Sequence, residues 1–136
     1  MKRMLLLIVV GVVVAALAWV RLAPNDPARW HVDAQVTADE DLPFGAKRLL
    51  DVSDVSLEAL DAVIMATPRT SRLAGSVGEG HITYVTRSRI MGFPDYATVQ
   101  VQDGQIALWS RLRYGQSDTG VNRARVNGWL DTLGQS

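Results

Sequence analysis

An uncharged apolar run near the amino terminus constrains this chain more than any other feature. Residues 4–20 read MLLLIVVGVVVAALAWV and contain no charged side chain. At about 1.5 Å of rise per residue, a helix over this run spans roughly 25 Å, close to the bilayer core of about 30 Å. Arg21 can extend its charge to the interface, and Trp19 and Trp30 suit the aromatic belt found there. The run predicts a transmembrane anchor over residues 1–22.

The alternative for the same run is a cleaved signal peptide. Lys2 and Arg3 form a positively charged start, and Ala16-Leu17-Ala18 offers a small-x-small cleavage site. The apolar run continues beyond this site, which favours an uncleaved anchor. The denser positive charge before the run favours a cytoplasmic amino terminus, with the rest of the chain on the periplasmic side.

The composition of the anchor suggests its partners. Leu5 lies within the apolar run, and Trp19 lies near its end. Gly11 and Ala15 have the small-xxx-small spacing that lets another membrane helix pack closely. We therefore expect the anchor to contact the lipid bilayer and other membrane protein subunits.

The formal net charge is zero, but the charges are unevenly distributed. Residues 26–61 have a net charge of −6, whereas residues 1–21 and 62–136 each have a net charge of +3. All basic side chains of the last part are arginines, whose planar forks pair with carboxylates or phosphates. A net charge of zero disfavours nucleic acid as a partner, because phosphate-driven binding needs a strongly basic surface. The chain has no cysteine, which excludes disulfides and thiolate metal sites.

After the anchor, the sequence predicts an entry segment and two amphipathic helices. Residues 23–55 contain three prolines and predict a loop-rich segment. A first helix is expected over residues 55–66, with Ser56 as its N-cap. A second helix is expected over residues 119–133, with Asp118 as its N-cap.

Between these helices the apolar pattern has a period of two, which is typical of β-strands. The expected strands are Arg72–Val77, His81–Arg89, Tyr96–Gln102 and Gln105–Arg113. Asp103-Gly104 between the last two strands predicts a two-residue hairpin turn. We expect an antiparallel four-stranded meander with one apolar face covered by the two helices. Residues 56–134 would then form a small α+β domain of two layers.

Polar side chains concentrate around the loops that join the later elements. The candidates for a polar clamp or an anion-binding site are Arg87, Arg89, Asp95, Arg111, Arg113, Asp118, Asn122, Arg123 and Arg125. In the favoured explanation, Asp95 and Asp118 accept arginine forks and fix the loops beside the sheet. In the alternative, the guanidinium groups and the free N–H groups of the helix start bind an outside anion.

Several separated blocks of residues match the pattern of a known family. The blocks are Arg87-Ser88, Gly92-Phe93-Pro94-Asp95, Ser110-Arg111, Gly115, Ser117-Asp118, Gly120, Asn122-Arg123 and Arg125, in this order. Over roughly residues 55–133 the chain resembles the bacterial and plastid family called domain of unknown function 1499. Many members have an amino-terminal membrane segment, so the resemblance implies a single-pass protein, here of the bacterial inner membrane. It implies no reaction.

The sequence contains no recognisable catalytic or cofactor motif. It has no G-x-S-x-G elbow, no nucleotide-binding glycine pattern and only two histidines, so we expect no cofactor and no metal. The expected function is a membrane-anchored, non-catalytic interaction module, as an accessory or assembly subunit of a larger membrane protein complex. The alternative is a binder of an anionic lipid headgroup or a small phosphorylated ligand. A hydrolase that uses Asp95 and His81 is a third hypothesis.

Overall fold

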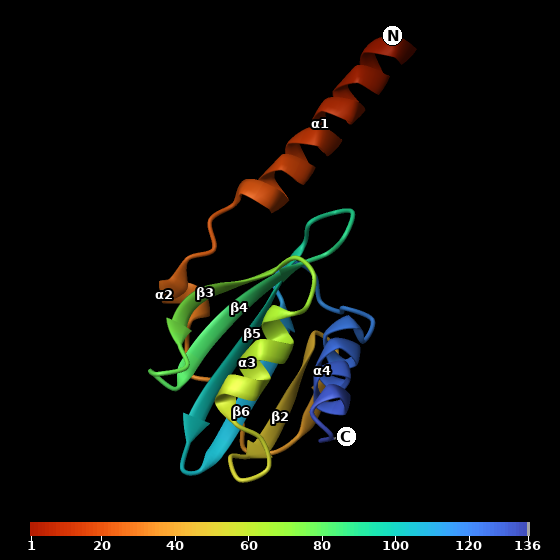
Figure 1. The fold of residues 1–136 in the computed structure, drawn as a ribbon. Helices are drawn as coiled ribbons and strands as arrows, with labels where there is room; N and C mark the ends of the chain where they lie inside the picture. Colours follow the sequence, from red (N-terminus) through yellow and green to blue (C-terminus); the bar gives the residue numbers. More distant parts are fainter. Residues whose placement is uncertain (136) are drawn as a thin grey trace.

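The computed structural model describes residues 1–135. Helix α1 (Lys2–Leu22) projects away from a single sheet, and helices α3 (Leu57–Met65) and α4 (Val121–Thr132) lie across one face of that sheet (Figure 1). The short helix α2 (Pro27–Trp30) follows α1 on the path into the domain. The prediction of an α+β fold with an apolar amino-terminal helix is confirmed.

The sheet has six antiparallel strands in the order β1-β2-β6-β5-β4-β3. The strands are β1 (Glu40–Leu42), β2 (Gly45–Asp51), β3 (Thr70–Ser76), β4 (His81–Arg87), β5 (Pro94–Gln102) and β6 (Gln105–Leu112). The prediction of four strands was wrong, because β1 and β2 come from the segment expected to be loop-rich. Strand β1 has only three residues, and Lys47 and Arg48 interrupt the apolar alternation of β2. The four predicted strands correspond to β3 to β6, with ends shifted by no more than two residues.

Local signals in the sequence explain the start of α3 and the last hairpin. Ser56 accepts a hydrogen bond from the backbone N–H of Ala59 at 3.1 Å and caps α3 as predicted. Asp103 and Gly104 join β5 to β6 with φ angles of 51° and 77°. Both angles lie in the left-handed region that a tight hairpin turn of two residues requires.

The main core lies between the two helices and the sheet. It contains Leu57, Leu60 and Ile64 from α3, Val126, Trp129 and Leu130 from α4, and Leu50, Ile82, Val99, Ile106 and Leu108 from the strands. Tyr84 is fully buried in this core and donates a hydrogen bond to Asp61 of α3 at 2.8 Å. Arg72 of β3 pairs with the same carboxylate. One aspartate therefore ties α3 to β3 and β4.

The other face of the sheet is covered by the first part of the entry segment, which precedes β1. A second, smaller core on this face contains Ala34, Val36 and Ala107, with Leu49 and Trp109 partly buried against them. Trp30 stacks on Tyr96 of β5, with 4.0 Å between the ring centroids. Gln100 of β5 accepts a hydrogen bond from the backbone N–H of Ala34 at 3.0 Å. The entry segment therefore wraps the sheet, and Trp30 packs on the domain.

Helix α1 has the length and composition needed to cross a membrane. It is apolar over most of its 21 residues, and none of its side chains is buried. A signal sequence near an amino terminus has the same properties. The residues predicted for the anchor, Leu5, Gly11, Ala15 and Trp19, all lie on this helix.

Candidate functional site

The predicted polar residues occupy three separate places instead of one. The first place, the α4-start cluster, contains Asp95, Asp118, Asn122 and Arg125. The second, the back-face pair, consists of Arg111 and Arg113. The third, the arginine pocket, is lined by Arg87 and Arg89 together with Arg21 and Arg69. Arg123 is exposed on α4 and belongs to none of these groups.

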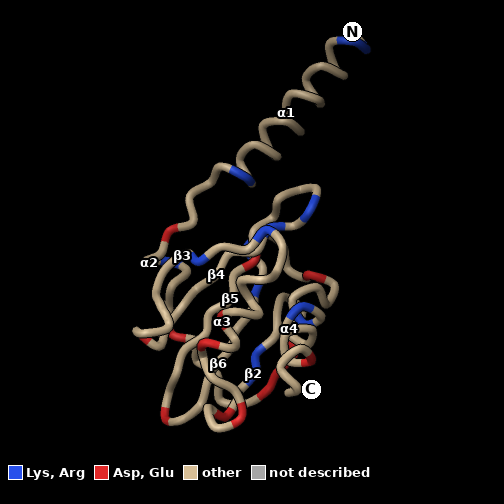
Figure 2. Tube along the Cα trace, in the orientation of Figure 1, with Lys and Arg blue, Asp and Glu red and all other residues tan. Residues whose placement is uncertain are grey.

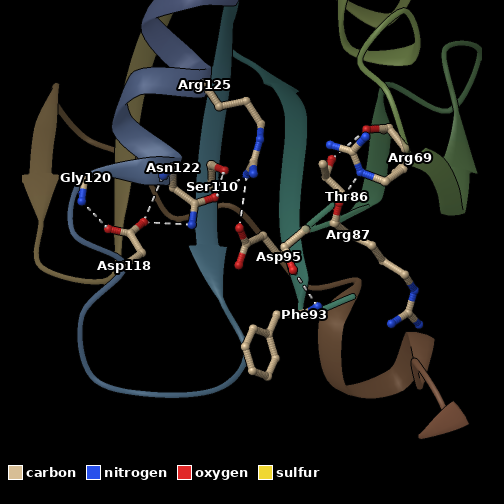
Figure 3. Close-up of polar contacts among 12 residues, drawn as sticks. Arg69, Thr86, Arg87, Phe93, Asp95, Ser110, Asp118, Gly120, Asn122 and Arg125 are labelled. Carbon is tan, nitrogen blue, oxygen red and sulfur yellow. Dashed lines mark hydrogen bonds and ion pairs between the residues drawn. The ribbon is translucent and has the colours of Figure 1, made fainter. Parts of the chain in front are cut away.

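Asp118 holds the start of α4 from outside the helix. Its Oδ1 accepts a hydrogen bond from the backbone N–H of Gly120 at 2.8 Å (Figure 3). Its Oδ2 accepts from the backbone and side chain of Asn122 at 2.9 and 2.8 Å. Burial alone would raise the pKa of Asp118, but these hydrogen bonds outweigh burial and lower it. The prediction that Asp118 occupies the N-cap position was wrong: Gly120 occupies it, and α4 begins at Val121.

Asn122 connects the strands to α4 within the α4-start cluster. It is fully buried and accepts a hydrogen bond from Ser110 of β6 at 2.5 Å. It also accepts one from Arg125 at 3.1 Å, and Arg125 pairs with Asp95 of β5 at 3.2 Å (Figure 3). One side-chain amide therefore joins β5, β6 and α4 at the end of the sheet.

Asp95 is mostly buried and lines a shallow pocket. Burial raises the pKa of Asp95; the Arg125 guanidinium opposes this rise, and the Asp118 carboxylate adds to it. The pocket has a volume of about 270 Å³ and is also lined by Phe93 and Tyr114. Each of the three charged groups that line it already has a partner within the chain. This arrangement favours a polar clamp over a ligand site.

Arg111 is buried on the back face without a carboxylate partner among residues 1–135. It is only 4% exposed. Its Nη1 donates to Thr98 Oγ1 at 2.7 Å, and its Nη2 donates to the carbonyl oxygen of Trp30 at 2.7 Å. Burial lowers the pKa of Arg111 to about 10. Because this pKa still lies well above neutral pH, the side chain remains charged there. The entry segment therefore supplies an acceptor for a buried charge.

Arg113 makes a similar connection closer to α1. Its Nη1 donates to the carbonyl oxygen of Pro24 at 3.0 Å and to Tyr96 Oη at 3.1 Å. The Tyr96 hydroxyl donates in turn to Asn25 Oδ1 at 2.5 Å. The back-face pair thus fastens residues 24–30 to the sheet.

The two histidines lie far from Asp95. His31 stacks on His81, with 3.9 Å between the ring centroids. His81 is paired with Gln100 across β4 and β5, whereas Asp95 is paired with Thr86, five residues further along the ladder. At about 3.3 Å per residue, this separation is roughly 17 Å. The structure therefore does not bring together the acid–base pair that the hydrolase hypothesis needs. Within residues 1–135, no group of three or more His, Asp or Glu side chains is arranged to hold a metal ion.

The arginine pocket lies where α1 meets the domain. Its volume is about 370 Å³, and its lining consists of Arg21, Arg69, Arg87, Ser88, Arg89 and Gly92. Arg87 donates to the carbonyl oxygen of Val20 on α1 at 3.2 Å and to that of Gly92 at 2.9 Å. Arg21 donates to the carbonyl oxygen of Ile90. Gly92 has a φ of 71°, which favours glycine, and a Cβ there would lie 2.9 Å from Arg21 Nε, so a larger residue would displace the Arg21 side chain.

The charges of the arginine pocket are not neutralised by the described part of the chain. No carboxylate lines the pocket, and none of its four arginines forms an ion pair within residues 1–135. Figure 2 shows basic residues at the end of the domain that faces α1, whereas many acidic residues lie toward the opposite end. Uncompensated positive charge in a concave site favours the binding of an anion.

Sequence reasoning missed two of the four arginines in this pocket. Arg21 was interpreted only as the end of the anchor, and Arg69 precedes β3 in a turn with a φ of 58°. Arg87 and Arg89 were among the predicted clamp or anion-site residues, but both were expected on one strand, and β4 ends at Arg87. The available signal was that arginines occur at the end of α1, just before β3 and at the end of β4. The sequence does not show which of these ends lie next to one another in the fold.

The comparisons with known proteins identify the family. The chain matches the family model described as "Protein of unknown function (DUF1499)" over residues 20–133. The chain belongs to this family. No curated protein and no solved structure matches it. The resemblance seen over residues 55–133 is confirmed, and the DUF1499 match also includes the residues that form β1 and β2.

The blocks that carry the DUF1499 resemblance gather at one end of the sheet. Ser88, Asp95, Asp118 and Arg125 line the pocket of the α4-start cluster. Ser88 also lines the neighbouring arginine pocket, together with Gly92. Several residues of the family pattern therefore line two adjoining features, the α4-start cluster and the arginine pocket, whereas Arg111 of the same pattern belongs to the back-face pair.

Proposed function

We propose that this DUF1499 protein is a single-pass membrane protein whose domain is a non-catalytic module that binds an anionic lipid. The observation that carries the proposal is the arginine pocket, in which four guanidinium groups line one concavity without a carboxylate. Arginine forks match phosphate oxygens in geometry and charge. A phosphate bound between the four groups would also reduce their mutual repulsion.

The position of the pocket favours a lipid phosphate over a soluble one. Arg21 belongs to the last turn of α1, and Arg87 contacts the carbonyl oxygen of Val20. If α1 is an uncleaved anchor, this level of the helix corresponds to the headgroup layer of the bilayer. Lys2 and Arg3 before α1 support a cytoplasmic amino terminus and a periplasmic domain in the bacterial inner membrane.

The test is a lipid titration of the full-length protein in mild detergent, with bound phosphatidylglycerol counted by native mass spectrometry. We expect Arg89→Gln to weaken binding about fivefold, because an arginine near anionic lipid contributes about 1 kcal/mol. Arg89 is exposed and forms no ion pair within residues 1–135, so we expect its replacement to leave the fold intact.

Arg123→Gln is the matched control. It removes one exposed guanidinium that does not line the pocket, and we expect unchanged binding. An equal loss in both variants would mean that net charge alone attracts the lipid, which contradicts the proposal. Displacement of the lipid by millimolar inorganic phosphate would identify a soluble phosphate as the ligand instead.

A second candidate function is an accessory or assembly subunit of a membrane protein complex. The observation that favours it is an open, mainly apolar groove of about 370 Å³ between α3 and α4. Ala62, Ala66 and Trp129 contribute to its lining. A groove of this kind can receive an apolar side chain of a partner subunit.

Co-purification in mild detergent tests the second candidate. Ala62 is exposed on α3, so Ala62→Glu places a charge in the groove without entering the core. We expect this variant to lose its co-purifying subunits, whereas Glu58→Ala on the exposed side of the first turn keeps them. A monodisperse wild-type monomer without crosslinked neighbours would contradict this function.

A further inference from the structure

The loop between β4 and β5 exposes an apolar tip that the lipid-binding proposal does not use. Ile90 is 77% exposed, Met91 is 40% exposed and Phe93 is 39% exposed. None of them belongs to either core. Single exposed apolar side chains are common on protein surfaces, but three of them in one short loop form a patch.

The backbone of this loop is closed on itself. Gly92 N–H donates to the carbonyl oxygen of Ser88 at 3.2 Å, and Ser88 N–H donates to that of Phe93 at 3.0 Å. Phe93 N–H also donates to Ser88 Oγ at 2.9 Å. These bonds hold the tip in a fixed shape, so Ile90 and Met91 cannot fold back onto the domain without breaking them.

The tip lies beside the end of α1. Figure 1 shows the β4–β5 loop rising from the domain toward the base of that helix. Arg21 of α1 donates to the carbonyl oxygen of Ile90, and Arg87 joins Val20 of α1 to Gly92 of the loop. The exposed tip is therefore held next to the point where the apolar run of α1 ends.

We propose that Ile90 and Met91 enter the interfacial layer of the bilayer that α1 spans and make a second membrane contact. Arg21 and Arg89 lie close to the tip in the chain fold, so their charged groups can remain with the lipid phosphates while the apolar side chains go deeper. The inference rests on the part of the proposed function in which α1 crosses the bilayer. Two contacts fix the tilt of the domain and keep the arginine pocket at the headgroups.

A single-cysteine labelling experiment on the full chain tests this contact. The chain has no cysteine, so Ile90→Cys gives a unique site for an environment-sensitive fluorophore. Gly11→Cys reports on α1, where a new Cβ meets nothing within 4 Å. Gln105→Cys reports on an exposed position at the start of β6, at the end of the sheet remote from the β4–β5 loop. Each labelled protein is placed in nanodiscs of phosphatidylcholine with brominated acyl chains, which quench fluorophores in the apolar layer.

We expect a large loss of emission at positions 11 and 90 and none at position 105. Loss at position 11 but not at position 90 would overturn the second contact and leave lipid binding by the arginine pocket standing. The absence of loss at position 11 would overturn both, because α1 would not span the bilayer. Loss at position 90 without any phosphatidylglycerol preference in the titration above would overturn the lipid-binding function and keep the contact.

Discussion

The guanidinium group of Arg111 lies over the indole ring of Trp109, 4.2 Å from the ring centroid. Arg111 is enclosed between the sheet and the entry segment, and it donates hydrogen bonds to the hydroxyl of Thr98 and to the carbonyl oxygens of Trp30 and Trp109. A buried charge without such partners would cost several kcal/mol. The position of the entry segment and the charged state of Arg111 therefore depend on each other.

Arg111→Ala is expected to destabilise the protein by roughly 2–4 kcal/mol, because it leaves a cavity and removes three charged hydrogen bonds. Urea unfolding of the full-length protein in detergent, followed by tryptophan fluorescence, measures this loss. Arg123→Ala removes an exposed arginine and should change stability by no more than about 0.5 kcal/mol. If Arg111→Ala kept full stability but lost lipid or partner binding, the clamp role of Arg111 would be refuted.

Asp118→Ala is expected to cost about 1–2 kcal/mol, because the start of α4 loses the acceptors for two backbone N–H groups. Asp118→Asn keeps one oxygen acceptor and should cost less. The same unfolding assay compares the two variants. Equal stability of wild type and Asp118→Ala would show that the carboxylate contributes nothing to the helix start.

The parts of the fold that depend on local pattern were predictable from the sequence. Ser56 marked the start of α3, and the alternation of apolar residues located β3 to β6. Strand β2 was missed because two adjacent charged residues, Lys47 and Arg48, lie within it. In a strand of alternating polarity, one of these two positions would hold an apolar side chain. The pairing of β2 with β6 depends instead on Gly45, where a Cβ would lie 2.1 Å from the carbonyl oxygen of Ser110. Such a contact between distant segments leaves no periodic signal.

The candidate site was predictable in its residue types but not in its grouping. Asp95 was expected to accept an arginine, and it pairs with Arg125. Asp118 was expected to do the same, but within residues 1–135 it accepts its hydrogen bonds from Gly120 and Asn122 instead. Arg111 was expected to share a cluster with them, but it lies on the other face of the sheet, against Trp30. Arg21 could not be assigned to a pocket from the sequence, because its neighbours there come from a loop about 69 residues away.

Trp30→Ala is expected to loosen the entry segment before it affects the main core. The variant loses the stack on Tyr96, and a stacked aromatic pair contributes about 0.5–1.5 kcal/mol beyond its buried area. The Arg29 side chain is already exposed. Opening of the segment frees the backbone around it, so trypsin cleavage there should be roughly tenfold faster. Trp19→Ala on α1 removes an exposed tryptophan and should leave the rate unchanged. An unchanged rate in Trp30→Ala would contradict a role for Trp30 in fastening the segment.

Asp61 should make the stability of the domain depend on acid pH. The hydrogen bonds from Arg72 lower the pKa of Asp61 below its ordinary value of 3.8, although burial opposes them. The ionised carboxylate therefore stabilises the folded state above that value, and this contribution is lost as the pH falls through the lowered pKa of the folded state. We expect Asp61→Asn to be less stable at neutral pH and to lose less stability than wild type between about pH 5 and pH 2. Urea unfolding across this range measures both effects, with Asp131→Asn as an exposed control. The same pH dependence in wild type and Asp61→Asn would show that the pairing with Arg72 does not persist in solution.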